Sequence, residues 1–344
     1  MYDILTLTGL ALILGLIPKS ACSSPNPLHE RGKWMELAPI ARAPRQEHGV
    51  TAVDSNIYIV GGITTVLANA TSVPTLDWVE VYSTTQNKWW SVSPIPTPVN
   101  HANVVSVNGK VYVLGAMAGE GAWEGIPDCF EYTPETDTWV RLPSMAVDQA
   151  RGASAVGVRG STIFLAGGLT SLNFDAQQVS VKTVTAYDVE TKRWTVLPDL
   201  PEARDHVGGA VIDDIFYVVG GRVNGVLNAR NTTYALDLSC LSQGANWVEK
   251  AQMPTARGGL ATSHVDGVIY AFGGEGDATL LPNGVYNETE AYDTRSDTWI
   301  KYPVMSFPRH GMNAVAVGRC NHIPGGGWVT QSGAVSSTND AFCV

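Results

Sequence analysis

The stretch Val268-Ile-Tyr-Ala-Phe-Gly-Gly274 places a glycine doublet directly after a short apolar run with the composition of a β-strand. Just before it, Asp266-Gly267 has the composition of a two-residue hairpin turn, because such turns need positive φ at their centre. The same doublet, or its Gly-Ala equivalent, recurs at intervals of 52 to 54 residues, ending at Gly62, Ala116, Gly168, Gly221, Gly274 and Gly326. A repeat of this period indicates a β-propeller.

A series of tryptophans runs in step with the doublets. Its members are Trp34, Trp89, Trp139, Trp194, Trp247 and Trp299. We interpret these side chains as packing between blades, because large aromatic residues contribute most of their energy through burial. Residues 257–300 contain four strand-like segments separated by turns, so each repeat is expected to form a four-stranded antiparallel blade.

The last repeat is short of one strand. After Gly326 only residues 339–343 are strand-like. At the other end of the chain, Trp34 stands before Arg45 in the same way that Trp299 stands before Arg309. The N-terminal strand therefore supplies the missing piece, and closure of the ring removes the free sheet edges. The sequence predicts an all-β protein: a six-bladed propeller, one domain over residues 22–344, closed by its N-terminal strand.

Composition and targeting signals restrict the class of protein. A net charge of −10 in 344 residues argues against nucleic acid as a partner, because affinity for phosphates comes from Lys and Arg. Residues 4–17 are almost continuously apolar and small residues follow them, which predicts a signal peptide over residues 1–21 and a secreted protein. About 14 apolar residues are too few to cross a bilayer that needs roughly 20, so we expect no membrane association in the mature form. N-glycosylation is expected at three sequons, those of Asn69, Asn231 and Asn287.

The cysteines suggest one disulfide in an oxidising compartment. Cys320 and Cys343 fall at strand ends of the last blade that alternation places on the same face, so they are predicted to pair. Cys129 and Cys240 fall at opposite ends of strands in non-neighbouring blades and are predicted to stay unpaired.

One face of the propeller is expected to carry the function. Sixteen residues before each doublet stand Arg45, Val99, Arg151, Arg204, Arg257 and Arg309, and His48, His101, His206 and His310 lie within three residues of this register. Because strands alternate in direction, this register shares a face with the long loops between the second and third strands, where binding residues usually lie. The sequence-based hypothesis is a ligand site at the axial mouth formed by Arg45, His101, Arg151, Arg204, His206, Arg257, Arg309 and His310. The alternative, a structural belt of arginines within the blades, stays open at this stage.

Apolar strand, glycine doublet and a turn such as Tyr132-Thr-Pro-Glu-Thr-Asp-Thr-Trp139 together resemble the kelch repeat, over nearly all of residues 31–344. This resemblance implies the fold and leaves the activity open. Kelch-type copper oxidases, such as galactose oxidase, use a Tyr-His dipeptide that this chain does not contain, and the His, Asp and Glu spacing of the plant specifier proteins is also missing. We therefore expect neither a metal nor another cofactor.

In size and signal peptide the chain is similar to stand-alone fungal kelch-like propellers that guide hetero-Diels–Alder reactions of tropolone meroterpenoid pathways. The resemblance implies a metal-free pericyclase that joins a quinone methide to a terpene alkene, with a small molecule as its partner. Arg and His would polarise the carbonyl, and the pocket would hold the two reactants together. A non-catalytic module that binds a peptide or glycan is the alternative, and a copper radical oxidase is the third and weakest one.

Overall fold

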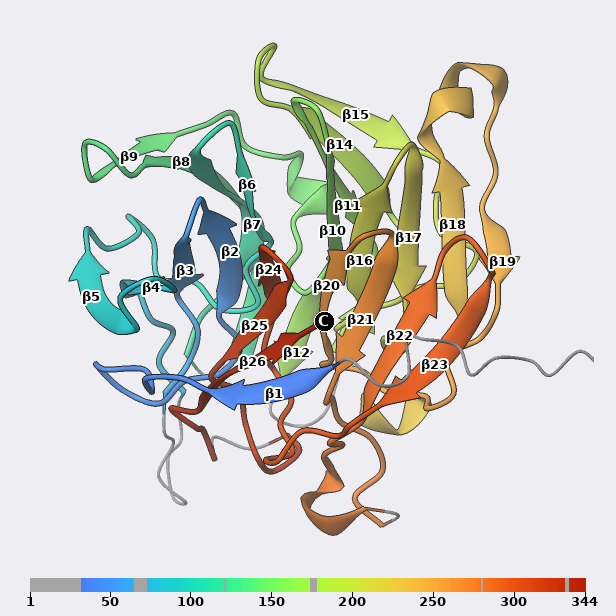
Figure 1. Ribbon diagram of the computed structural model, residues 1–344. Coiled ribbons are helices and arrows are strands. Elements are labelled where there is room, and N and C mark those ends of the chain that lie inside the picture. The colour runs from blue at the N-terminus through green and yellow to red at the C-terminus, as the bar shows by residue number, and fades with distance from the viewer. Residues whose placement is uncertain (1–31, 65–72, 121, 174–177, 280, 332–333) are drawn as a thin grey trace, which may run out of the picture.

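The computed structural model describes residues 32–64, 73–120, 122–173, 178–279, 281–331 and 334–344. Its strands form six antiparallel sheets around a central axis (Figure 1). The innermost strands contact one another in the order β2, β6, β10, β16, β20, β24 and back to β2, so the ring is closed. The predicted six-bladed propeller is confirmed.

Each blade contains four strands in meander order. The first three blades are β2 (Gly49–Val53), β3 (Asn56–Val60), β4 (Val79–Ser83) and β5 (Lys88–Val92); β6 (Val104–Val107), β7 (Lys110–Ala118), β8 (Ala122–Thr133) and β9 (Thr138–Arg141); and β10 (Ala155–Arg159), β11 (Thr162–Ala166), β14 (Val184–Asp188) and β15 (Arg193–Leu197). The next two are β16 (Gly208–Ile212), β17 (Ile215–Val219), β18 (Thr233–Asp237) and β19 (Val248–Lys250); and β20 (Ala261–Val265), β21 (Val268–Phe272), β22 (Thr289–Asp293) and β23 (Thr298–Tyr302). Four short 3-10 helices lie in the described connections: η2 (Val147–Gln149), η3 (Val226–Asn228), η4 (Leu238–Gln243) and η5 (Pro282–Gly284).

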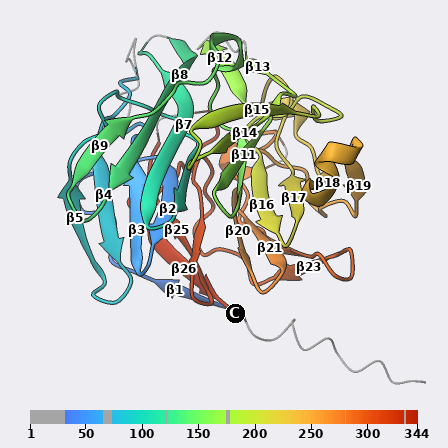
Figure 2. The same ribbon diagram turned by 90° about the horizontal axis from the view of Figure 1, so that it is seen from above.

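The sixth blade is built from both ends of the chain. It consists of β24 (Val315–Val317), β25 (Cys320–Pro324), β26 (Asn339–Cys343) and the N-terminal strand β1 (Lys33–Glu36). The register pairs Lys33 with Cys343 and Glu36 with Asp340, and β1 lies beside β26 in both views (Figures 1 and 2). Closure by the N-terminal strand is confirmed.

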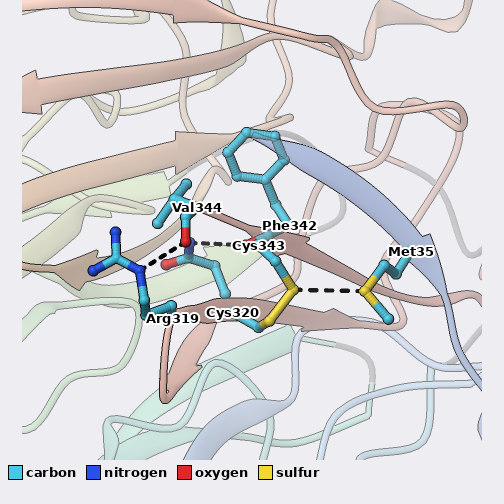
Figure 3. The surroundings of a disulfide bond; sticks show 7 residues. Met35, Arg319, Cys320, Phe342, Cys343 and Val344 are labelled. Atoms are coloured by element: carbon cyan, nitrogen blue, oxygen red, sulfur yellow. Dashed lines mark hydrogen bonds between the residues drawn. A yellow bond between two sulfur atoms is a disulfide. The ribbon is translucent and has the colours of Figure 1, made fainter. Parts of the chain in front are cut away.

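A disulfide fixes the end of the chain within this blade. Cys320 and Cys343 lie opposite each other on β25 and β26, with their Cα atoms 3.9 Å apart (Figure 3). The Arg319 Nε donates to the backbone oxygen of Val344 at 2.8 Å beside this bond. Within the described residues Cys129 and Cys240 form no disulfide, as expected.

The glycine doublets mark the places where neighbouring blades meet. Gly273 and Gly274 both have positive φ, which a side chain disfavours. The Gly274 N–H donates to the Arg309 carbonyl of the next blade at 2.8 Å. A Cβ atom on Gly273 would collide with the same carbonyl. The doublet is therefore required by close backbone approach between blades.

The six tryptophans join the blades on the outside of the ring. Each indole N–H donates to a backbone carbonyl of the preceding blade: Trp34 to Pro303, Trp89 to Ala38, Trp139 to Ser93, Trp194 to Pro143, Trp247 to Pro198 and Trp299 to Ala251. Apolar clusters fill the spaces between successive blades. The role in blade packing that the sequence suggested is thereby confirmed.

One loop departs from the regular pattern. The connection after the third doublet forms β12 (Leu169–Asn173) and β13 (Gln178–Ser180), and β12 pairs with the start of β8 in the neighbouring blade. Figure 2 shows these strands together at one edge of the molecule. Trp123, which β8 carries at this point, lies over His101 with ring centroids 5.3 Å apart. The ribbon therefore reaches the residues near the axis through Trp123.

Among the described residues no helix is long and apolar enough to cross a membrane. The predicted signal peptide and Asn69 lie outside the described residues.

Candidate functional site on the propeller axis

A ring of six backbone hydrogen bonds surrounds the propeller axis. One residue of each blade, two positions after the arginine register, donates its N–H to the equivalent residue of the neighbouring blade at 2.6 to 3.1 Å. We call these six residues the axial ring: Glu47, His101, Ala153, His206, Gly259 and Gly311. All six have φ between 48° and 60°. Left-handed backbone at this position directs the side chain of each non-glycine member toward the axis, so the ring brings Glu47, His101 and His206 together.

The axial ring forms one end of a central cavity of about 450 Å³. The walls come from the innermost strands of all six blades, with residues such as Thr51, Ser106, Val158 and Thr262. Among the residues described, none from the long loops lines this cavity. The cavity therefore runs along the axis from the axial ring, on the side away from the loops.

Charged side chains gather behind the axial ring. Asp205 and His310 each directly follow the arginine of their repeat. Arg222 and Glu275 each stand directly after a glycine doublet. The two sets are brought together by isolated backbone bridges, such as that between Asp205 and Arg222. On the other side of the axis the position after the doublet carries apolar residues, Ile63, Met117 and Leu169, which pack with Trp123.

Hydrogen bonds link this cluster into a continuous network. The Nδ1 atom of His206 lies 2.5 Å from Asp205 Oδ1, and Arg222 Nε donates to that same oxygen at 3.1 Å. Arg222 also forms an ion pair with Glu275, whose second oxygen lies 3.3 Å from His310 Nδ1. Nearly all of these side chains are buried, and such networks specify a single arrangement when every member is satisfied.

Burial and charge shift the pKa values of the cluster. Burial lowers the pKa of His101 to about 4, and this outweighs the opposing attraction of Glu47. Burial alone would raise the pKa of Glu47, but the neighbouring His101, His206 and His310 hold it below its usual range. The carboxyl group of Glu275 is likewise held at low pKa against its burial, by His310 and Arg222. The carboxylates are therefore ionised and His101 is neutral near pH 7.

The structure does not bring the five predicted arginines to the cavity. Arg45, Arg151, Arg204, Arg257 and Arg309 are at most 1% exposed, and in the described chain none of them lines the cavity. Each guanidinium bonds to carbonyls of its own blade, as in the 2.7 Å bond from Arg151 to Gly167 and the 2.9 Å bond from Arg204 to Gly220. Three of them also pair with buried carboxylates of their own blade: Arg45 with Glu80, Arg257 with Glu290 and Arg309 with Asp340.

The predicted histidines have different surroundings. His101 and His206 line the cavity with Nε2 atoms 3.0 Å apart, whereas His310 lies behind the axial ring against Glu275. His48 is fully buried, and its Nε2 lies 3.1 Å from the Pro324 carbonyl. Of the histidines in the sequence-based site, His101 and His206 line the cavity and His310 does not.

Four members of the site were not foreseen from the sequence: Glu47, Asp205, Arg222 and Glu275. Two signals pointed to them. Glu47 stands at the same repeat position as His101 and His206, and Arg222 and Glu275 are charged residues directly after a glycine doublet, where Ile63 and Leu169 are apolar.

Comparison with known proteins agrees with this architecture. The family described as the KLHDC2/KLHL20/DRC7 Kelch-repeats domain matches residues 29–221 and again residues 152–344. The chain belongs to the kelch-repeat family. The kelch propeller is 38% identical over 307 residues to the Kelch-like protein terF of Aspergillus terreus, a match that covers 87% of this chain and 65% of that protein. It is also 22% identical over 317 residues to Beta-scruin of Limulus polyphemus, covering 89% of this chain and 32% of the relative.

The kelch propeller thus spans somewhat less than two thirds of the length of terF, and about a third of Kelch-like protein 34 of Homo sapiens. Among solved structures it is similar to one titled "Structure of YjhT", with a TM-score of 0.70 and 16% identity over 87% of this chain and 95% of the other. At that identity the likeness concerns the fold alone.

Proposed function

We propose that the axial cavity binds a small, largely hydrophobic molecule with a polarisable oxygen, and that the protein promotes a hetero-Diels–Alder cycloaddition on it. The observation that carries the proposal is the cavity of about 450 Å³ that ends on His101 and His206. Small-molecule sites usually occupy about 300 to 1,000 Å³ and combine apolar walls with a few polar groups. The relationship to a fungal kelch-like protein agrees with this assignment.

The cycloaddition requires the protein mainly to position the two reactants. In a hetero-Diels–Alder reaction of a quinone methide with an alkene, a carbon–carbon and a carbon–oxygen bond form from π electrons of the two reactants, and nothing leaves. Holding the two reactants side by side supplies most of the acceleration. The polar end of the cavity would orient the quinone methide oxygen and stabilise the electron density that it gains.

A tryptophan within the cavity tests this assignment. Ser106 is half-buried and lines the cavity on β6, so Ser106→Trp fills the space where a reactant would sit. Val196→Trp on the outer strand β15, at a position that is 63% exposed, is the matched control. We expect S106W to reduce product formation from a tropolone quinone methide and a terpene alkene to the uncatalysed rate, with the melting temperature retained. Wild-type turnover by a folded S106W protein would place the reaction elsewhere.

A second candidate function is non-catalytic binding of a polar ligand such as a peptide or glycan. Among the described lining residues there is no Phe, Tyr or Trp, and the polar Asn313 and His264 are exposed in the cavity wall. Saturable binding of a glycan or peptide that S106W abolishes, without any acceleration of the cycloaddition by the wild-type protein, would favour this candidate.

We also propose that the protein passes through the secretory pathway and is glycosylated. Asn231 and Asn287 are half-buried and stand two residues before the third strands of their blades, β18 and β22. Treatment of protein from a eukaryotic host with an N-glycosidase should increase its electrophoretic mobility, and N231Q and N287Q should each remove part of the shift. Unchanged mobility would reject glycosylation.

A further inference from the structure

Two imidazoles and a carboxylate converge at the end of the cavity. The Nε2 atom of His101 lies 3.0 Å from Nε2 of His206 and 3.1 Å from Oε2 of Glu47. The ligand atoms of all three residues lie within 4.8 Å of one another, and all three residues line the cavity. Their side chains come from three different blades, positioned by the axial ring.

The second nitrogen of each imidazole is committed to an oxygen. His206 Nδ1 lies 2.5 Å from Asp205 Oδ1, and because a carboxylate accepts hydrogen bonds, Nδ1 carries the proton. His101 Nδ1 lies 2.6 Å from Asn100 Oδ1. The lone pair of each imidazole is therefore on Nε2, and in His206 it accepts the N–H of Arg222 at 3.1 Å.

The orientation of the Asn100 amide has its own support. The Thr75 hydroxyl donates to the Gly119 carbonyl at 2.7 Å, and the Asn100 Nδ2 donates to that hydroxyl at 2.9 Å. This chain of bonds places the amide oxygen of Asn100 toward His101. A histidine that donates one ring N–H to a fixed oxygen and offers the other nitrogen as a lone pair has the arrangement of a metal ligand.

The Nε2 atom of His206 has a further, charged neighbour. Arg222 donates one N–H to His206 Nε2 at 3.1 Å, but it is already paired with Asp205 and Glu275. The described contacts of His101 Nε2 are with the Nε2 atom of His206 and the Oε2 atom of Glu47.

We propose that Glu47, His101 and His206 bind one divalent transition-metal ion, of which zinc is the best match, with an open coordination position toward the cavity. Two histidines and one carboxylate are a ligand set of zinc sites that keep a position for water or substrate. With zinc–ligand bonds of about 2.0 to 2.1 Å, tetrahedral ligand atoms lie about 3.3 Å apart, close to the 3.0 and 3.1 Å separations from His101 Nε2. The ligand atoms of His206 and Glu47, which lie within 4.8 Å of each other, would move closer together on binding the ion. The ion would replace the Arg222 hydrogen bond to His206.

A metal at this point changes the mechanism that the sequence suggested. A bound zinc ion acts as a Lewis acid and polarises a carbonyl oxygen that reaches its open position. The expectation of a metal-free protein came from the lack of the motifs that other kelch-type metal sites use. The ligands proposed here, Glu47, His101 and His206, come instead from equivalent positions of three repeats. The metal-binding proposal does not depend on the proposed cycloaddition, because binding of the ion is measured without substrate.

Metal titration of the purified chain tests the proposal. The protein is stripped with a chelator, dialysed, and titrated with zinc chloride by calorimetry, and bound metal is counted by elemental analysis. We expect one tight equivalent for the wild type and for His264→Ala, the matched control, because His264 lines the same cavity outside the ligand set. His101→Gln and His206→Gln should lose the tight site. Asp205→Asn should weaken zinc binding about 10- to 100-fold, the usual effect of removing the hydrogen-bond partner of a ligating histidine.

Two further measurements keep the test decisive if a histidine variant fails to fold. Glu47→Gln retains the side-chain shape and should also lose the tight site, and X-ray absorption of the zinc-loaded wild type should show two imidazole nitrogens. Wild-type protein without a tight equivalent would overturn the proposal. Equal zinc affinity in the wild type, E47Q and folded H101Q would overturn it as well.

Discussion

Replacing Arg257 with alanine separates the two roles that the repeated arginines could have, blade stabilisation and ligand binding. Arg257 and Glu290 are both fully buried, and their charged atoms lie 2.5 Å apart. The same guanidinium donates to the carbonyls of Thr255 at 3.1 Å and Ala271 at 3.2 Å. Arg257→Ala therefore leaves the Glu290 carboxylate buried without its guanidinium partner.

The expected cost follows from the loss of the buried partner, because the other cation near Glu290, Lys301 at 3.6 Å, is 63% exposed. Removal of one partner of a buried ion pair typically costs about 3 to 5 kcal/mol. At roughly 2 °C per kcal/mol, the lower coefficient for domains of 150 to 250 residues, the melting temperature should fall by about 6 to 10 °C. Adding Glu290→Gln to Arg257→Ala should recover part of the loss, because no buried charge then remains.

The assay records the melting temperature and the product yield of the same preparations. Arg193→Ala is the control, since Arg193 is exposed at the start of the outer strand β15 and should change neither quantity. Below its melting temperature R257A should retain its activity per folded molecule. A variant that melts like the wild type and has lost product formation would refute the structural role and support the original hypothesis of a ligand-binding arginine.

Three further outcomes are expected. Deletion of residues 22–40 removes β1, which pairs with β26 from Lys33 to Glu36, and should prevent a cooperative thermal transition; a truncated chain as stable as the parent would contradict closure. Replacing both Cys320 and Cys343 with serine should lower the free energy of unfolding by about 3 kcal/mol, because the disulfide closes a loop with a sequence separation of 23, and denaturant titration measures this. Burial lowers the pKa of His48 to about 3. Between about pH 6.5 and 3 the unfolded chain therefore binds a proton that the folded chain does not. The free energy of unfolding should fall as the pH is lowered through this range, by up to about 1.4 kcal/mol per pH unit. His48→Asn should reduce that slope in urea titrations, and identical slopes would reject His48 as its source.

The fold was predictable because the contacts between neighbouring blades require the same residue types in every repeat. Each glycine doublet marks a close approach between blades, and each tryptophan marks a hydrogen bond to the preceding blade, as Trp299 does to Ala251. The same constraint applies six times, so the period reveals the architecture without knowledge of any single contact. The disulfide followed from this architecture, because Cys320 and Cys343 become register partners only once the last blade is formed.

The site was predictable only in part, because sequence periodicity does not say which side chains face the axis. Arg257 and His101 belong to nearly the same register, yet Arg257 bonds within its own blade and His101 lines the cavity. The difference is set by the left-handed backbone of the axial ring, which turns the chain just after the arginine. The importance of Glu47 was missed because it shows only when the repeats are aligned, which places Glu47 at the repeat position of His101 and His206.

The choice of residues in the axial ring itself supports a function on the axis. The backbone there is left-handed in every blade, with φ of 60° at Gly259 and 59° at Gly311, where glycine adopts it readily. Glu47, His101 and His206 adopt the same conformation at a cost of about 1 to 2 kcal/mol each, although glycine at two equivalent positions completes the ring of hydrogen bonds equally well. Ala153 adopts the same conformation with φ of 53°, so the backbone strain by itself does not identify a function. What distinguishes the other three positions is that they place two imidazoles and a carboxylate on one cavity.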